Sequence, residues 1–273
     1  MPDATALRED LVRRLRNSGV VHDTAVVEAL RVVPREVFLP GLDLDEAYRD
    51  IAVPTHRDQT GEVVSSCSQP SMVALMLEQL SARPGQRVLE IGAGTGYNAA
   101  LLKHLVGPGG RVVSIDVDPE ICVEARARTQ AAGAEVEVEI GDGALGWPAA
   151  APYDRIEVTA AAGDLPTAWW DQLGETGRLV VPLHLGPRAE ASVAWERAGT
   201  ALRALSRLPC GFLALRGEPP SAPRREPPLG PLLFGRHALQ AFRGEPLQLP
   251  PGTVVVRRPV TTFAFLPEKA QEW

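Results

Sequence analysis

The segment from residue 88 to residue 97 carries the clearest chemical signal in the sequence. An acidic residue and three glycines recur in it at every second position, namely Glu90, Gly92, Gly94 and Gly96. Glycines at the end of a strand let the backbone approach a ligand closely, and a following helix offers free N–H groups. A dinucleotide loop needs the spacing G-x-G-x-x-G, which would put glycine in place of Tyr97 or Ala99. The spacing found here therefore predicts a ligand that has no pyrophosphate.

Acidic residues also follow the next two predicted strands. Asp116, which is followed by Val117, ends an apolar run about 20 residues after the glycine segment, where a carboxylate can accept hydrogen bonds from both hydroxyls of a ribose. Asp142 and Gly143 come directly after the third strand, where they would contact an adenine edge. Ligands of open parallel sheets bind outside the carboxyl ends of the strands. Together these positions predict an adenosine-containing ligand.

Alternating strands and helices are expected to hold these residues. Two amphipathic helices are predicted at 5–18 and 23–32, the second capped by Asp23. An irregular segment is predicted at 35–69 and a mostly buried helix at 71–80. Strands are then predicted at 87–91, 111–116, 135–140, 155–159 and 178–182, and helices at 97–106, 119–132 and 166–173. Such alternation is typical of right-handed βαβ units, so the predicted fold class is α/β, a mostly parallel twisted sheet with helices on both faces.

The composition of the chain changes near Gly217. Eleven of the 25 prolines lie beyond this residue, together with seven basic and five acidic residues. Short apolar runs before it predict antiparallel strands at one edge of the sheet, at 191–195, 202–205 and 211–215. Beyond it, a proline-rich linker, a helix at about 233–243 and a β run at 254–256 are predicted. The predicted regions are 1–66, 67–217 and 218–273.

Composition excludes several classes of protein. Of 273 residues, 45% are hydrophobic and 23% are charged, which is typical of a globular chain and not of a disordered, collagen-like or coiled-coil one. The net charge of −6 argues against broad binding to nucleic acid or to anionic membranes. Three widely spaced cysteines fit neither a disulfide framework nor a zinc site, and no metal is expected. The first residues show no basic-then-apolar signal segment, so the expected compartment is the cytoplasm.

Six segments occur in the order in which the protein-L-isoaspartate O-methyltransferase family has them. They lie at 33–40, 47–50, 68–70, 141–143, 151–156 and 177–182, and read VPREVFLP, AYRD, SQP, GDG, APYDRI and GRLVVP. With the glycine segment, they make the sequence resemble this family over roughly residues 5–217. The resemblance implies a Rossmann-like class I methyltransferase with N-terminal helices and a C-terminal extension. It also implies S-adenosylmethionine as cofactor and, as methyl acceptor, the carboxylate of an L-isoaspartyl or aspartyl residue in a protein or peptide, whose ester can cyclise to a succinimide.

The resemblance also assigns roles to individual residues. Ser68 matches the family's active-site serine and would hydrogen-bond the acceptor carboxylate, although it is also a candidate N-cap of the following helix. The residues that would bind the cofactor are Pro70, Ser71, Met72, Glu90, Gly92, Gly94, Gly96, Asp116, Val117, Asp142 and Gly143. A carboxylate has a pKa of about 4, so it is ionised at neutral pH and needs no general base to act as a nucleophile.

Two segments depart from the family pattern. Residues 51–67 are longer and more charged than usual, and His56 or Arg57 could meet an acceptor carboxylate. The tail at 218–273 lies outside the common pattern, and its arginines could bind an acidic peptide. These departures leave three hypotheses open. The first is repair of isoaspartyl residues in damaged proteins. The second is tailoring of a ribosomally synthesised peptide, such as a lanthipeptide or graspetide. The third is a non-catalytic homologue that binds the cofactor or a partner, against which the intact glycine segment argues.

Overall fold

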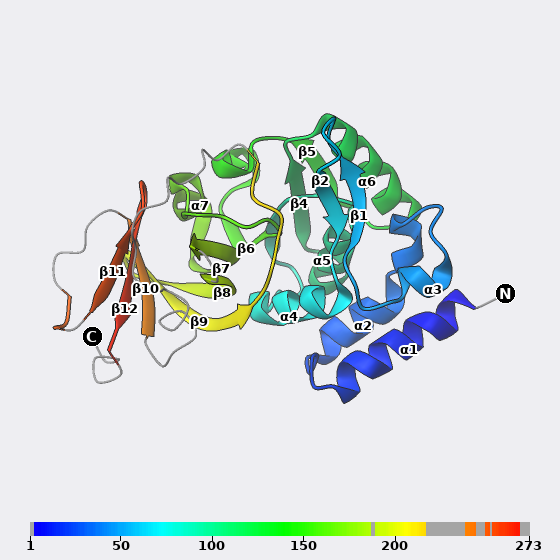
Figure 1. The fold of residues 1–273 in the computed structure, drawn as a ribbon, viewed down its shortest axis with the longest axis horizontal. Helices are drawn as coiled ribbons and strands as arrows, with labels where there is room; N and C mark the ends of the chain where they lie inside the picture. Colours follow the sequence, from blue (N-terminus) through cyan, green and yellow to red (C-terminus); the bar gives the residue numbers. More distant parts are fainter. Residues whose placement is uncertain (1–2, 187–188, 217–237, 244–248, 252, 268–273) are drawn as a thin grey trace. The chain divides into compact units, whose positions relative to one another are not determined.

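The structure is a computed structural model (Figure 1). Its chain divides into two compact units, residues 1–141 and 142–273. The structure describes residues 3–186, 189–216, 238–243, 249–251 and 253–267. The division falls after Gly141, and so differs from the boundaries expected near residues 66 and 217. No helix in these described ranges is long and apolar enough to cross a membrane.

Parallel strands β3, β4 and β5 form the centre of the first unit. They span Arg87–Ile91, Arg111–Asp116 and Glu137–Ile140, and they alternate along the chain with helix α5, Tyr97–Val106, and helix α6, Pro119–Ala131. Ile91 pairs with Ile115, and Asp116 with Ile140, so the carboxyl ends of the strands lie at one edge. Helix α5 packs on β3 and β4, and α6 packs on β4 and β5. These elements confirm the alternation that the sequence predicts.

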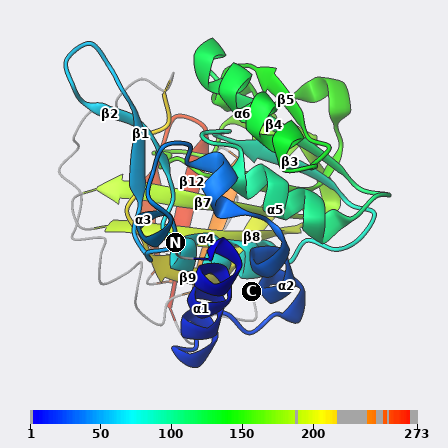
Figure 2. The same ribbon diagram turned by 90° about the vertical axis from the view of Figure 1, so that its right-hand side faces the viewer.

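Helices α1, α2 and α4 also belong to this unit. They span Ala4–Asn17, Thr24–Val32 and Pro70–Leu80. Helix α1 lies beside α2 (Figure 2), and α2 also packs on α4 and α5. The carboxylate of Asp23 accepts a hydrogen bond of 2.8 Å from Ala25 N, which confirms Asp23 as the N-cap of α2. An aspartate is favoured there because it pairs a backbone N–H that the helix leaves free.

The expectation of an irregular segment at 35–69 is wrong. The structure forms a 3-10 helix η1, a short helix α3 and a hairpin of strands β1 and β2, at Arg35–Phe38, Leu44–Ala47, Val53–Arg57 and Val63–Cys67. The hairpin turn is closed by Asp58, whose carboxylate accepts from the N–H groups of Thr60 and Glu62. A hydrogen bond from the Thr60 hydroxyl, and after it these two backbone bonds, hold the pKa of Asp58 below its ordinary value. The polar residues that suggested a loop therefore form the turn of a hairpin.

The second unit is built on one sheet with the strand order β11-β12-β10-β9-β8-β7-β6. In chain order, strands β6 to β12 span Tyr153–Val158, Leu173–Gly186, Ala189–Ala198, Ala201–Pro209, Ala238–Arg243, Val254–Arg257 and Thr261–Leu266. Helix α7 spans Thr167–Gln172. Strands β6 and β7 are parallel, whereas every pairing from β7 to β11 is antiparallel. Short 3-10 helices at Gly143–Leu145 (η2) and Pro148–Ala150 (η3) precede β6. The α/β class is confirmed, with a larger antiparallel edge than expected.

The tail supplies much of that antiparallel edge. Residues 238–243 form strand β10 and not the end of a helix, while 233–237 lie outside the described residues. Leu239 and Ala241 are buried and their neighbours are more exposed, which is the two-residue period of a strand. The β run at 254–256 is confirmed as part of β11, and β12 was not expected. The strand expected at 211–215 is reduced to a single bridge between Ala161 and Ala214.

Strand β12 provides buried aromatic side chains to the second unit. Phe263 and Phe265 are 0% exposed, and the Phe263 ring lies 6.1 Å from that of Trp195 on β8. Strand β10 pairs with β9 on one side and with β12 on the other. The described tail strands therefore share a hydrophobic core with β8, although composition alone suggested a separate extension.

Candidate functional site

The glycine segment forms a tight loop between β3 and α5. Gly92, Gly94 and Gly96 have φ angles of 105°, 51° and 87°, values that residues with a side chain rarely adopt. The N–H groups of Gly92 and Ala93 donate to the carbonyl of Ile115 at 2.8 and 3.0 Å. The loop is thereby attached to the end of β4, and each glycine is required by its backbone conformation.

Two of these glycines also face neighbouring backbone. A Cβ on Gly96 would lie 3.0 Å from Thr129 Cγ2 and 3.1 Å from the Ala125 carbonyl, so this glycine lets α6 pack against the loop. A Cβ on Gly94 would have the Ser66 carbonyl at 3.6 Å as its nearest neighbour. The glycine loop consequently lies beside strand β2, which leads to Ser68.

Asp116 stands at the carboxyl end of β4, next to this loop. Its Oδ2 accepts a hydrogen bond of 3.3 Å from Gly94 N, and its Oδ1 accepts one of 3.2 Å from Asp118 N. The side chain is half-buried, and Val117 beside it is 40% exposed. A carboxylate thus reaches the surface at the point where the sequence predicts a ribose.

Glu90 lies in the interior of the first unit, beneath the loop. It is 0% exposed, and its carboxylate accepts hydrogen bonds from Asn98 Nδ2 at 2.8 Å and from the Ser114 hydroxyl. These contacts join β3 to β4 and to the first turns of α5. In this structure Glu90 therefore supports the loop from below.

Ser68 lies between the end of β2 and the start of α4. The N-cap of α4 is Gln69, whose own side chain makes no capping hydrogen bond, so the expectation that Ser68 is the cap is wrong. Pro70 occupies the first turn as expected, because a proline there costs no hydrogen bond. Within the described part of the chain the half-buried Ser68 hydroxyl has no hydrogen-bond partner. Ser71 and Met72, also half-buried, follow in the first turn of α4.

Asp50 holds this turn and is absent from the residues that sequence analysis selected. Its Oδ1 accepts a hydrogen bond of 2.8 Å from Ser71 N, and its Oδ2 accepts one of 3.2 Å from Gln69 Nε2. A carboxylate at the start of a helix is stabilised by free N–H groups and by the helix dipole. The available signal was its place in the segment at 47–50 that resembles the family, but this segment does not indicate which residues Asp50 contacts.

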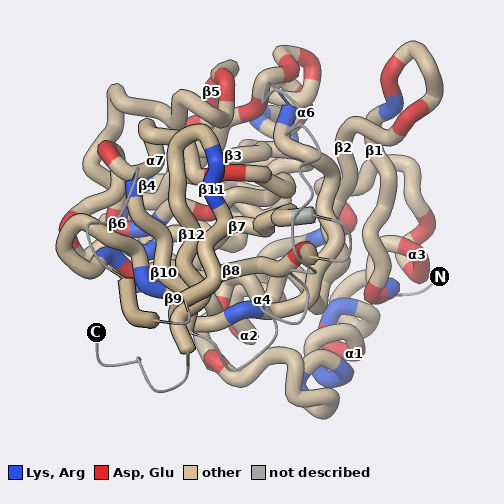
Figure 3. Tube along the Cα trace, turned by 60° about the vertical axis from the view of Figure 1, so that its left-hand side comes forward, with Lys and Arg blue, Asp and Glu red and all other residues tan. Residues whose placement is uncertain are grey.

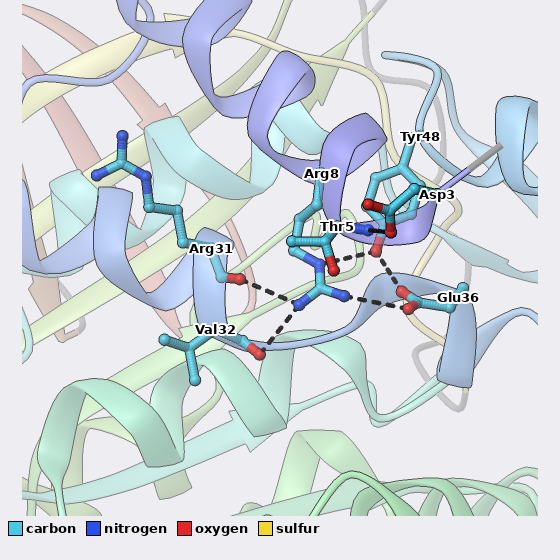
Figure 4. A network of polar contacts seen from close by, with 7 residues as sticks. All are labelled: Asp3, Thr5, Arg8, Arg31, Val32, Glu36 and Tyr48. Atoms are coloured by element: carbon cyan, nitrogen blue, oxygen red, sulfur yellow. Dashed lines mark hydrogen bonds and ion pairs between the residues drawn. The ribbon is translucent and has the colours of Figure 1, made fainter.

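A polar network fixes the chain just before Asp50 (Figure 4). Arg8 on α1 donates from Nε to the Tyr48 hydroxyl at 3.0 Å and from Nη2 to Glu36 Oε1 at 3.1 Å. Arg8 Nη1 also donates to the carbonyl of Arg31 at 3.1 Å, and the Tyr48 hydroxyl donates to Glu36. Burial raises the pKa of Tyr48 to about 12, so this hydroxyl stays protonated and can donate. The network positions the segment that carries Asp50.

Replacing Asp50 by alanine is expected to lower kcat at least tenfold while changing the affinity for cofactor little. The first turn of α4 would lose two hydrogen bonds to a charged acceptor, each worth about 1.5–3 kcal/mol, and Ser68 would lose its fixed position. Steady-state kinetics and calorimetric cofactor binding would check this. Asp45→Ala, on the exposed surface of α3, is the control. An unchanged kcat in Asp50→Ala would contradict the positioning role.

His56 and Arg57 of the β1–β2 hairpin have partners within the first unit. Arg57 donates from Nη1 to the Gly61 carbonyl at 2.8 Å, across its own turn, and the turn carries charges of both signs (Figure 3). His56 Nε2 lies 3.3 Å from a carboxylate oxygen of Glu124 on α6. The His56 contact attaches the hairpin to α6, and both side chains have a partner within the first unit.

Asp142 and Gly143 begin the second unit. The Asp142 carboxylate accepts a hydrogen bond of 2.9 Å from Ala144 N and so caps η2. Gly143 is buried, and its carbonyl accepts a hydrogen bond of 2.8 Å from Trp169 Nε1. The two residues are therefore held in a defined turn that directly follows β5 and Gly141 in the chain.

Comparison with known proteins decides the family. The model of the protein-L-isoaspartate(D-aspartate) O-methyltransferase family matches residues 6–216. The chain belongs to this family. It is 40% identical to the protein-L-isoaspartate O-methyltransferase of Methanopyrus kandleri over 213 residues, which cover 77% of this chain and 92% of that protein. It is 44% identical to the Methylorubrum extorquens protein of the same name over 183 residues, 67% of this chain and 76% of the other.

Solved structures of the protein-L-isoaspartate O-methyltransferase family share this fold. One, 29% identical, superposes with a TM-score of 0.70 and covers 95% of this chain and 88% of its own. Another, from Plasmodium falciparum and in complex with S-adenosyl-L-homocysteine, is 19% identical, has a TM-score of 0.66, and covers 77% of this chain and 99% of its own. The class I methyltransferase fold is thus confirmed, and S-adenosylmethionine is the cofactor of the family.

The residues at the edge of the first unit fit an adenosyl group. Ala93 and Thr95, which have the only side chains of the loop at 92–96, are buried, and the Asp116 carboxylate is half-buried at the end of β4. A carboxylate suits the two hydroxyls of a ribose, because each of its oxygens can accept more than one hydrogen bond. The glycine loop and the carboxylate of Asp116 therefore agree with the family's cofactor.

Proposed function

We propose that this protein transfers a methyl group from S-adenosylmethionine to the carboxylate of L-isoaspartyl residues in proteins. The observation that carries the proposal is the match to the family model over residues 6–216, which includes the glycine loop, Asp116 and Ser68. The product is a methyl ester, which can cyclise to a succinimide. The cytoplasm stays the predicted compartment.

The cofactor is proposed to bind along the carboxyl ends of β3 and β4. Asp116 would accept hydrogen bonds from the ribose hydroxyls, and the glycine loop would allow close approach of the backbone. Glu90 would support the loop from below, through its bonds to Asn98 and Ser114. The remaining proposed contacts are Pro70, Ser71, Met72, Val117, Asp142 and Gly143. When bound, the cofactor supplies a methyl group already activated by the positive sulfonium.

Ser68 is proposed to orient the acceptor. Its hydroxyl would donate a hydrogen bond to one oxygen of the isoaspartyl carboxylate and leave the other oxygen free to attack. The acceptor is ionised at neutral pH, so no side chain has to remove a proton. The protein contributes chiefly by orientation and exclusion of water, and orientation alone is worth roughly 7–11 kcal/mol.

A pair of peptides tests this function. They share one sequence and differ only in carrying L-isoaspartate or L-aspartate at one position. With methyl-labelled cofactor, we expect label on the isoaspartyl peptide and at most traces on the aspartyl one. Label on the aspartyl peptide alone would indicate a tailoring enzyme, and cofactor binding without transfer to either would indicate a non-catalytic homologue. The comparisons favour neither alternative, because the relatives found are named protein-L-isoaspartate O-methyltransferases.

A further inference from the structure

The loop that follows β6 in the second unit is largely buried but carries only short side chains. Residues 160–164 read Ala-Ala-Ala-Gly-Asp, so backbone hydrogen bonds must largely determine its conformation. On one side, Ala162 N donates to the Pro182 carbonyl at 2.8 Å, and the Ala162 carbonyl accepts from His184 N at 2.9 Å. These bonds hold the loop alongside the carboxyl-terminal half of β7.

On its other side the loop pairs at Ala161 with residues 213–215, through bonds of 2.8 Å to the Leu213 carbonyl and from Leu215 N. The turn between β11 and β12, residues 258–261, holds the next part of the loop, residues 163–165. Asp164 is 8% exposed, and its Oδ2 accepts a hydrogen bond of 2.7 Å from Val260 N, while its Oδ1 accepts one of 2.7 Å from Leu165 N. Thr261 Oγ1 donates to the Leu165 carbonyl at 3.2 Å. In both bonds between the turn and the loop, the two bonded residues are 96 positions apart in the sequence.

Arg258 strengthens the same attachment. Its Nε donates to the Gly163 carbonyl at 3.2 Å, and its Nη2 donates to the Leu185 carbonyl at 2.9 Å. One guanidinium thus joins the loop after β6 to the end of β7. Because a guanidinium donates from a rigid plane, these bonds restrict the loop more than a flexible ammonium would.

The position of the loop gives this attachment a functional meaning. It stands at the carboxyl end of a parallel strand, the edge at which open α/β sheets bind their ligands. Loops at such edges carry binding residues and require a rigid support. We propose that the 258–261 turn is a positioning element, which holds the loop after β6 in the conformation that binds the acceptor polypeptide. Arg258 and Asp164 act through that loop. The proposal rests on the proposed function, since the acceptor is the isoaspartyl polypeptide.

Kinetics of four variants of the full chain test the proposal. In Arg258→Ala and Asp164→Ala, we expect KM for the isoaspartyl peptide to rise about tenfold or more, because buried partners lose hydrogen bonds. The dissociation constant for S-adenosylmethionine should stay within about twofold of the wild type, a split that general destabilisation would not produce. Asp164→Asn keeps one acceptor oxygen and should recover part of the affinity. The control is Arg243→Ala. Arg243 lies in the same tail, and this change removes only its surface ion pair with Asp171.

Amide hydrogen exchange gives a second measurement that needs no substrate. Residues 160–165 should exchange about tenfold faster in Arg258→Ala than in the wild type, while β8 stays protected. Unchanged exchange in this loop would overturn the proposal, as would a lower melting temperature with an unaltered KM. If Asp164→Ala does not fold, Arg258→Ala and Asp164→Asn decide the matter. A wild-type protein that methylates no isoaspartyl peptide would instead refute the proposed function, whatever the exchange shows.

Discussion

Replacing Asp116 by alanine is expected to weaken binding of S-adenosylmethionine by about 10- to 150-fold. The ribose hydroxyls would lose a charged acceptor worth roughly 1.5–3 kcal/mol. The glycine loop would also lose the hydrogen bond from Gly94 N to Asp116 Oδ2. Isothermal titration calorimetry with the cofactor alone measures the effect without any acceptor.

Asp118 offers a matched control two residues away. Its carboxylate accepts from Glu120 N at 3.0 Å and caps α6, so Asp118→Ala should cost about 1 kcal/mol of stability without weakening cofactor binding. Asp116→Asn should bind with intermediate affinity, because the amide keeps an acceptor but loses the charge. Equal affinity of wild type and Asp116→Ala would refute the proposed contact with the ribose.

Replacing Phe263 by alanine is expected to lower the free energy of unfolding by about 3–5 kcal/mol. The side chain is 0% exposed and packs against Trp195, so the change leaves a cavity in the core that β12 shares with β8. Denaturant unfolding followed by Trp fluorescence measures this. Leu205→Ala on β9 is the control, because Leu205 is 41% exposed and a surface change there should alter stability by at most about 0.5 kcal/mol.

A chain that ends after Arg216 extends the same test. It lacks β10, β11 and β12 and would leave the outer edge of β9 and the face of Trp195 uncovered. We expect it to be poorly folded in its second half and prone to aggregate, since an uncovered apolar edge strand pairs with other chains. A truncated protein that unfolds cooperatively at the temperature of the full chain would show the tail to be a separate module.

The local elements were largely predictable. The longer helices and the parallel strands of the first unit agree with the sequence predictions because apolar runs, capping residues and prolines are local signals. The positive φ angles of Gly92, Gly94 and Gly96 likewise follow from local spacing. The hairpin at 53–67 was missed because its turn residues resemble those of a loop. Strand β10 was taken for a helix because a short apolar run fits both periods.

The sequence by itself determined the family, the cofactor and the set of residues at the carboxyl ends of the strands, because motifs and spacing are local properties. Only the tertiary structure showed that Asp50 holds the turn after Ser68, that Glu90 supports the glycine loop, and that Arg258 and Asp164 join the tail to the loop after β6. These partners are separated by long stretches of chain, so no local pattern encodes which of them meet. Pairing of β10 with β9 depends in the same way on burial of a shared core, which composition near Gly217 does not reveal.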